Sequence, residues 1–208
     1  MKVLAIRTPM AKSELEILDE MHCLRAKVFR GRLSWKVQCV DGREYDEFDR
    51  QAPTYIIALS SSGRVVGSAR LLPAVGTTML QSVFSQLLEG GHLDAHRGMI
   101  ESSRFCVDTT DEEGRADGSL HLATLSMFAG IIQWCVVNGY SELVTATDVR
   151  FERILNRAGW PMRRLGNPTM INETESVAGL LPIDLQIFER LRPEQFFSSF
   201  ADAQTKAT

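Results

Sequence analysis

A run of seven residues from Met99 to Phe105 combines apolar flanks with side chains that could do chemistry. It holds one carboxylic acid, Glu101, two serine hydroxyls and one guanidinium, within a segment that favours a buried strand. Burying such groups costs roughly a few kcal/mol each unless they are paired, so the run indicates a site. Burial also raises the pKa of a carboxylate, which makes Glu101 the candidate general base. The alternative is that Glu101 pairs with an arginine and only shapes a cleft.

A second set of residues lies upstream and has the chemistry of a receptor for a charged ligand. Its members are Arg25, Phe29, Trp35, Asp46 and Asp49. Carboxylates bind cations, aromatic faces bind cations or flat rings, and a guanidinium binds a carboxylate. An acidic surface turn beside two core aromatic residues is the alternative interpretation.

Periodicity and capping predict the elements that must position these two sets. The capping box Ser13-x-x-Glu16 predicts a helix that begins there and runs to about Phe29. Arg25 ends the apolar stripe of this helix. Residues 30–53 resemble a long irregular loop rich in charge, which is usually functional.

The strand predicted over residues 99–107 poses a geometric difficulty. On a regular strand Glu101 and Arg104 point to opposite faces, because side chains alternate. Both can line one pocket only if the strand is bulged or ends there. We therefore expect a local break near Ser102 or Ser103.

The rest of the chain mixes strands and helices. In order, we expect a hairpin over 54–72, a short helix over 80–88, a helix from Ser119 to about Val137, a strand over 142–147, a helix capped by Asp148 and ended by Gly159, and a last helix over 184–191. This mixture predicts an α/β sandwich with a mixed sheet. A single domain over residues 1–200 and a disordered tail over 201–208 complete the expected organisation.

Composition excludes several classes of function. The net charge of -3 argues against nucleic-acid binding, which favours a strongly basic face. The longest apolar helix carries polar residues and no basic flank, so we expect no membrane span. The first apolar run is too short for a signal peptide, which predicts a cytoplasmic protein. The four cysteines are far apart, and His92 and His96 lie in a glycine-rich segment, so we predict no metal site.

The order and spacing of eight residues resemble the signature of the LuxI-type autoinducer synthases, the acyl-homoserine lactone synthases. They are Arg25, Phe29, Trp35, Asp46, Asp49, Arg70, Glu101 and Arg104. The likeness spans roughly residues 1–182 and includes the run Arg157-Ala158-Gly159-Trp160. It implies an acyltransferase-like fold related to the acetyltransferases, a three-layer α/β sandwich with a mixed, mostly antiparallel sheet. It also implies S-adenosylmethionine and an acyl thioester, on acyl-carrier protein or coenzyme A, as substrates, with no separate cofactor.

The resemblance assigns roles to particular residues. The catalytic set is Glu101, Arg104 and Ser103, and the S-adenosylmethionine set is Arg25, Phe29, Trp35, Asp46, Asp49 and Arg104. The acyl-binding set is Arg70, Ser103, Phe105, Met127, Thr145 and Phe151, with Leu143 and Trp160 as further candidates for an apolar tunnel. In this family a threonine at the position of Thr145 goes with acyl chains oxidised at the third carbon.

A cluster of arginines gives a candidate docking surface for an acidic carrier protein. It consists of Arg150, Arg153, Arg157, Arg163 and Arg164. A solvated helix face, favoured by the helix dipole, is the alternative interpretation.

Two other functions are open. An acetyl-CoA N-acetyltransferase would use a pyrophosphate loop, and the run Arg64 to Ala69 matches its R-x-x-G-x-A pattern. Since that run lies inside the expected hairpin and not before a helix, we interpret the match as coincidence. A non-catalytic module that binds a small molecule is the other alternative, and it would need no base on a buried strand.

Overall fold

The computed structural model describes residues 1–110 and 120–200, and one large mixed sheet runs through this part of the chain. Its strands are Lys2–Ile6 (β1), Thr54–Leu59 (β4), Val65–Pro73 (β5), Met99–Val107 (β6), Glu142–Asp148 (β7), Arg163–Arg164 (β8), Thr169–Ile171 (β9), Thr174–Pro182 (β10) and Phe197–Ser198 (β11). The order is β11-β1-β4-β5-β6-β7-β10-β8, with β9 beside β10. Only the pairs β1–β11 and β6–β7 are parallel among these strands.

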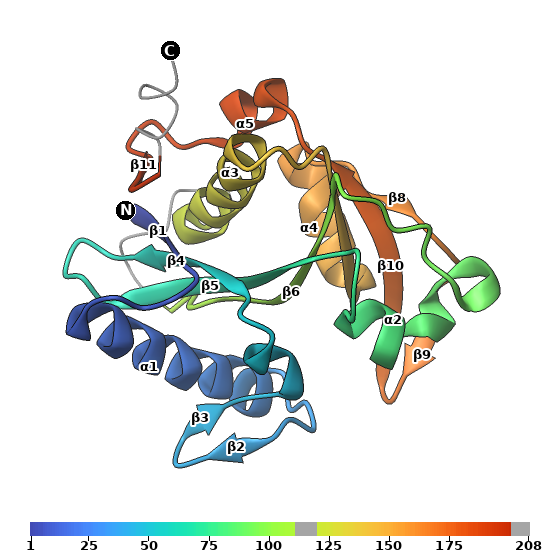
Figure 1. Cartoon of the computed structure of the whole chain (residues 1–208), viewed down its shortest axis with the longest axis horizontal. Helices are drawn as coiled ribbons and strands as arrows, with labels where there is room; N and C mark the ends of the chain where they lie inside the picture. The colour runs from blue at the N-terminus through green and yellow to red at the C-terminus, as the bar shows by residue number, and fades with distance from the viewer. Residues whose placement is uncertain (111–119, 201–208) are drawn as a thin grey trace.

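Helices cover both faces of the sheet (Figure 1). They are Lys12–Ala26 (α1), Met79–Val83 (α2), Leu122–Val137 (α3), Val149–Ala158 (α4) and Leu185–Leu191 (α5). The largest apolar core joins α3, α4 and α5 to one face, while separate clusters pack α1 and α2 against the other. The three-layer sandwich with a mixed, mostly antiparallel sheet is therefore confirmed.

The segment expected to be an irregular loop contains short ordered elements. They are a π-helical turn over Lys27–Arg32 (η1), a small hairpin of Cys39–Val40 (β2) and Arg43–Glu44 (β3), and a 3-10 turn over Glu47–Arg50 (η2). Two further 3-10 turns, Ser85–Leu87 (η3) and Glu89–Gly91 (η4), follow α2, so the helix expected over 80–88 is broken. The segment between α1 and β4 is thus a built part of the molecule.

The predicted start of α1 is wrong by two residues. The N-cap is Ala11, and the carboxylate of Glu14 accepts the backbone N–H groups of Met10 at 2.6 Å and Ala11 at 3.2 Å. Glu14 therefore serves the free helix amides in place of the Ser13 and Glu16 pair. The expected cap Ser119 and the expected tail 201–208 lie outside the described residues.

The acetyltransferase-like run Arg64 to Ala69 leads into β5, as expected from the hairpin. Gly67 pairs with Ala58 on one side and Val107 on the other, so its backbone is used by the sheet. A Cβ atom at Gly67 would lie 2.8 Å from Cγ of Met127 in α3. Glycine is needed here for close packing of helix against sheet, and the run forms no phosphate loop.

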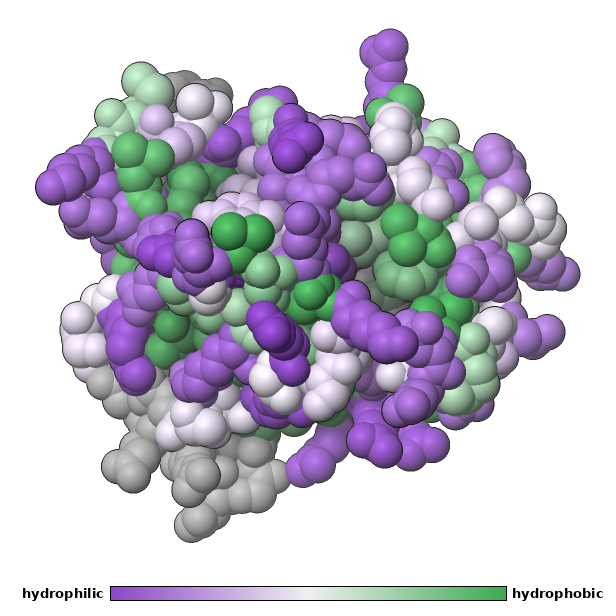
Figure 2. All heavy atoms as spheres, turned by 90° about the horizontal axis from the view of Figure 1, so that it is seen from below, coloured by the Kyte–Doolittle hydropathy of each residue, from purple (hydrophilic) through white to green (hydrophobic). Residues whose placement is uncertain are grey.

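The outer surface on the side of α1 mixes hydrophilic areas with smaller hydrophobic ones (Figure 2). Leu15 of α1 and Val40 of β2 are more than half exposed. The buried side of α1 instead carries Met21, Leu24 and Arg25. Arg25 is therefore directed from the helix into the interior, toward the sheet.

Candidate active site

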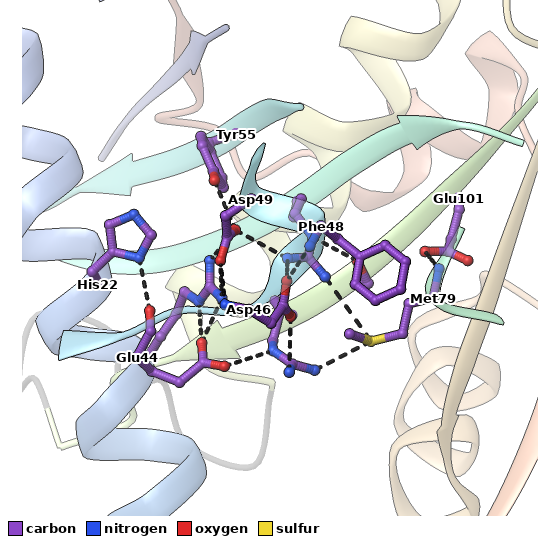
Figure 3. Close-up of polar contacts among 12 residues, drawn as sticks. His22, Glu44, Asp46, Phe48, Asp49, Tyr55, Met79 and Glu101 are labelled. Atoms are coloured by element: carbon purple, nitrogen blue, oxygen red, sulfur yellow. Dashed lines mark hydrogen bonds and ion pairs between the residues drawn. The ribbon is translucent and has the colours of Figure 1, made fainter. Parts of the chain in front are cut away.

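Six charged side chains from α1, from the segment 44–49 and from the sheet meet in one buried network (Figure 3). The three guanidinium groups are those of Arg25, Arg70 and Arg104, and the three carboxylates are those of Glu44, Asp46 and Asp49. Because the two sets are equal in number, their formal charges cancel. Five of these six residues belong to the predicted set, and Glu44 is an addition.

Arg25 holds the part of the network nearest α1. Its Nε donates to Glu44 Oε2 at 2.6 Å, and its two terminal nitrogens donate to the carboxylate of Asp49 at 2.8 and 3.0 Å. Burial opposes its charge, but these partners raise the pKa of Arg25. Burial likewise opposes the charge of Asp49, yet Arg25 and Arg70 hold the pKa of Asp49 well below its usual range. Both groups are thus held ionised.

Arg70 and Arg104 complete the network from the sheet. Arg70 Nη1 contacts Asp46 Oδ1 and donates to Asp49 Oδ1 at 3.0 Å. Arg104 Nε donates to Glu44 Oε1 at 3.0 Å, and its Nη2 lies 2.9 Å from Asp46 Oδ2. Each carboxylate therefore faces two arginines, so that no charge is buried without a partner.

A β-bulge in β6 brings Arg104 into this network. Arg104 has a positive φ of 53°, and the register with β5 shifts between the pairs Ser68–Cys106 and Arg70–Ser103. One extra residue on β6 reverses the alternation of side chains beyond it. The break predicted near Ser102 or Ser103 is thus confirmed, and it is centred on the next residue, Arg104.

The turn η2 fixes the two aspartates. Asp46 caps this turn by accepting the N–H of Phe48 at 2.9 Å, and Asp49 Oδ2 accepts the N–H of Asp46 at 2.9 Å. The hydroxyl of Tyr55 donates to Asp49 Oδ1 at 2.7 Å. Local capping therefore orients both carboxylates before any ligand is considered.

Phe29 and Trp35 form a stacked aromatic pair beside the network. Their ring centroids are 5.3 Å apart with an interplanar angle of 8°, and the guanidinium of Arg104 lies 5.6 Å from the Phe29 centroid. Phe29 belongs to the π-helical turn η1, an element often found at functional sites. The two predicted aromatic residues thus lie together and next to charge, as the receptor hypothesis requires.

Glu101 lies at the far side of the network, with its carboxylate at the start of α2. Oε1 accepts the N–H of Met79 at 3.1 Å, and Oε2 accepts the N–H of Leu80 at 2.7 Å. The residue is 1% exposed, and burial raises the pKa of Glu101 despite these donors and the nearby charge of Arg70. Among the described residues, the partners of its carboxylate are backbone amides and not an arginine, contrary to the alternative interpretation.

A small apolar cavity lies on the opposite face of the sheet, where β6 and β7 separate. Their pairing ends at Glu101 and Val144, after which the Thr145 hydroxyl donates to the carbonyl oxygen of Ser102 at 2.8 Å. The cavity measures about 20 Å³ and is lined by Ser102, Phe105, Phe128, Ile131, Leu143, Thr145, Phe151, Leu155, Trp160 and Leu181. An acyl chain can occupy it only if some aromatic side chains move.

The structure separates the predicted acyl-binding residues into two groups. Phe105, Thr145 and Phe151 line the cavity, as do Leu143 and Trp160. Ser103, Arg70 and Met127 do not line it. The Ser103 hydroxyl accepts from Arg70 Nε at 3.1 Å in the charged network, and Met127 packs under β5. Regular alternation places Ser103 on the Glu101 side of β6, and the bulge beyond it turns Phe105 to the cavity.

The predicted docking arginines lie on α4 and β8. Arg150, Arg153, Arg157 and Arg163 are exposed. Arg164 donates to both carboxylate oxygens of Glu152 at 2.7 Å, so its charge is already balanced. The surface has therefore less free positive charge than the sequence suggests.

Three residues of the site were missed by sequence reasoning. Glu44 could have been found from the alternation of acids in Glu44-Tyr45-Asp46, which places both on one side of an extended segment. Tyr55 and Met79 carry no comparable signal, because a strand tyrosine and a helix methionine are common core residues.

Other sites were searched for in the described part of the chain. Residues 1–110 and 120–200 contain no group of three or more His, Cys, Asp and Glu side chains arranged to hold a metal. His96 instead contacts Glu142 at 2.9 Å. None of the helices in these ranges combines the length and the hydrophobicity needed to cross a bilayer.

The fold, with a charged network on one face of the sheet and an apolar cavity on the other, is typical of an acyltransferase built as an α/β sandwich. At the level of fold alone, the chain resembles a proposed N-acetyltransferase from Lactobacillus plantarum, with a TM-score of 0.58, 12% identity and coverage of 88% of this chain and 97% of that one. The autoinducer synthase family model matches residues 10–191. The chain belongs to this family of autoinducer synthases, as its eight signature residues predicted.

Named relatives and a solved structure agree with this assignment. The chain is 57% identical to a probable acyl-homoserine-lactone synthase of Sinorhizobium fredii, over 95% of each chain. It is 54% identical to an acyl-homoserine-lactone synthase of Agrobacterium fabrum, over 95% of this chain and 94% of that one. The crystal structure of TofI in a ternary complex with an inhibitor and MTA has a TM-score of 0.74 and 26% identity, covering 92% of this chain and 96% of TofI.

Proposed function

We propose that this enzyme makes an acyl-homoserine lactone from S-adenosylmethionine and an acyl thioester. The relatives from S. fredii and A. fabrum carry this activity in their names. The by-product of such a reaction is methylthioadenosine (MTA), and TofI was solved with MTA bound. The observation that carries the proposal is a buried carboxylate, Glu101, set beside a network of paired charges and behind it an apolar cavity.

The charged network suits S-adenosylmethionine because this ligand carries both signs of charge. Its carboxylate can bind a guanidinium of the network in place of a protein carboxylate. The carboxylates released in this way can bind its ammonium and sulfonium. Arg25, Asp46 and Asp49 supply these groups, and the Phe29–Trp35 stack supplies a surface for the adenine. Because the ligand has a net charge of +1, this exchange leaves one of its positive charges over, and the carboxylate of Glu101 is available for that charge.

Glu101 acts first, by accepting a proton from the α-ammonium directly or through one water. The freed amine attacks the thioester carbonyl, an amide bond forms and the carrier thiol leaves. We assign stabilisation of the transient oxyanion to Arg104 and Ser103, which lie on the Glu101 side of β6. The methionine carboxylate then attacks its own γ-carbon, which closes the lactone and breaks the bond to sulfur, so that neutral methylthioadenosine departs.

The acyl chain is proposed to enter between β6 and β7, where Phe105 and Phe151 would rotate to widen the cavity. The Thr145 hydroxyl donates to Ser102 and must turn before it can bind a carbonyl on the third carbon of the chain. Acyl-carrier protein is the donor we favour, because Arg150 and Arg153 are exposed beside this entrance on α4, and acyl-CoA is the alternative. Location in the cytoplasm stays a prediction.

The test is mass spectrometry of reactions that contain the purified chain, S-adenosylmethionine and either acyl-carrier-protein or acyl-CoA thioesters. We expect a lactone and methylthioadenosine in equal amounts. Glu101→Gln should abolish turnover and keep S-adenosylmethionine binding by calorimetry, while Glu89→Gln, an exposed control, should change neither. Full turnover in Glu101→Gln would remove Glu101 as the base. Acetyl transfer from acetyl-CoA to other amines, without S-adenosylmethionine, would instead favour an N-acetyltransferase.

A further inference from the structure

Met79 occupies the point where the charged network meets Glu101. It is the first residue of α2, is 6% exposed, and donates its backbone N–H to Glu101 Oε1 at 3.1 Å. Its sulfur accepts from Arg104 Nη1 at 3.2 Å and from Arg70 Nη2 at 3.9 Å. Figure 3 shows Met79 beside Glu101, with dashed contacts from its sulfur toward the charged network.

This placement has an electrostatic consequence for Glu101. The charged group that acts on it is Arg70 on β5, and Arg104 on β6 reaches the Met79 sulfur. The start of α2 contributes the backbone amides of Met79 and Leu80, and the N-cap residue Thr78 contributes its hydroxyl. A guanidinium in direct contact with a buried carboxylate lowers its pKa by about 1 to 3 units. Such a contact would also make Glu101 a weaker base, because the strength of a base follows its pKa.

We propose that Met79 is a positioning residue that keeps Arg70 and Arg104 away from the carboxylate of Glu101. A thioether suits this place because it fills space, accepts weakly from a guanidinium and brings no charge of its own. With Met79 filling this space, Arg104 stays turned toward Glu44 and Asp46, and Arg70 stays turned toward Asp46 and Asp49. The role rests on the proposed function, in which Glu101 is the base.

The first test measures the pKa of Glu101 without an activity assay. Infrared difference titration of its carboxyl band, with Glu101→Gln as the background, is compared between the parent chain, Met79→Ala and Met79→Leu. We expect the Glu101 pKa in Met79→Ala to fall by about 1 unit or more, because the arginines can move into the vacated space. Met79→Leu retains the volume and should stay close to the parent. An unshifted titration in Met79→Ala, or an equal shift in both variants, overturns the proposal.

The second test uses the enzyme assay. The acidic limb of the kcat/KM profile should move to lower pH in Met79→Ala with the same sign as the infrared shift, and kcat should fall about 10-fold or more. Leu87→Ala is the matched control, because Leu87 is 1% exposed in the neighbouring turn η3 and should cost stability without moving Glu101. If Met79→Ala does not fold, Met79→Val takes its place.

The two readouts separate the failure of this inference from failure of the proposed function. If Glu101→Gln keeps full turnover, Glu101 is not the base, yet the infrared titration still decides whether Met79 holds the arginines away. If Glu101→Gln is inactive and Met79→Ala titrates like the parent chain, the proposed reaction stands and the role of Met79 is refuted.

Discussion

Glu44→Gln tests the charged network most directly, because the change preserves shape and removes one buried charge. The side chain of Glu44 is fully buried and binds Arg25 through Oε2 and Arg104 through Oε1. A glutamine can still accept from one arginine, but its amide NH₂ then faces the other. The network would hold three guanidinium groups against two carboxylates.

The expected loss of stability follows from the burial of these partners. Removing one member of a buried ion pair costs about 3 to 5 kcal/mol, because the remaining charge is left without compensation. We expect a value near the lower limit, about 3 kcal/mol, since glutamine keeps one acceptor. Urea unfolding measures this loss, and Glu47→Gln, with the same charge change at an exposed position of η2, should cost less than about 0.5 kcal/mol. A loss below about 1 kcal/mol in Glu44→Gln would refute the assignment of Glu44 as a balancing charge.

The same variant should also discriminate between two ligands. S-adenosylmethionine differs from S-adenosylhomocysteine by one methyl group and one positive charge. At an effective dielectric near 20, two unit charges ~8 Å apart interact by about 2 kcal/mol, which corresponds to on the order of 30-fold in binding. Calorimetry should therefore show that Glu44→Gln weakens S-adenosylmethionine far more than S-adenosylhomocysteine. Equal weakening of both ligands would point to a general distortion and contradict the electrostatic argument.

Two further perturbations follow from the site. The lowered pKa of Asp49 means that its ionisation stabilises the fold above the unfolded value of about 3.9, and this contribution is lost as pH falls through the folded pKa. Urea unfolding between about pH 2 and pH 6 should show a shallower acid decline in Asp49→Asn than in the parent chain, and an equal decline would contradict the linkage. Phe151→Ala should widen the cavity beside Phe105 and raise the preference for longer acyl chains about 10-fold in competition assays read by mass spectrometry, whereas unchanged product ratios would exclude this cavity as the acyl site.

The fold was largely predictable because its regular elements carry strong local signals. The hairpin of β4 and β5, the strand β6 and the capped helix α4 match their predicted positions, since apolar runs, turn residues and caps agree there. The failures lie where local signals compete. At α1 the carboxylate of Glu14 accepts the N–H groups of Met10 and Ala11, and the helix begins before the Ser13 and Glu16 pair predicts. In residues 30–53 the short elements are too brief for any periodic pattern.

The site was predictable as a set of residues but not as a set of contacts. From the sequence, the acids are predicted to bind the ligand's cations and an arginine to bind its carboxylate, with each side chain unpaired until the ligand arrives. In the structure Arg25 already binds Asp49 and Glu44, because a buried charge without a partner would be too costly. Which arginine pairs with which acid depends on the packing of α1, β3 and η2 against the sheet. No spacing in the chain specifies that packing.

The bulge in β6 shows how a chemical requirement can predict backbone geometry. Alternation along a regular strand places Glu101 and Arg104 on opposite faces, and a common pocket is then impossible. The φ of 53° at Arg104 inserts one residue, so that Arg104 joins the network while Phe105 turns to the apolar cavity. A single strand can therefore serve the charged site on one face and the apolar cavity on the other. Ser102 and Ser103 precede the insertion, so regular alternation places Ser103 on the Glu101 face and Ser102 on the cavity side.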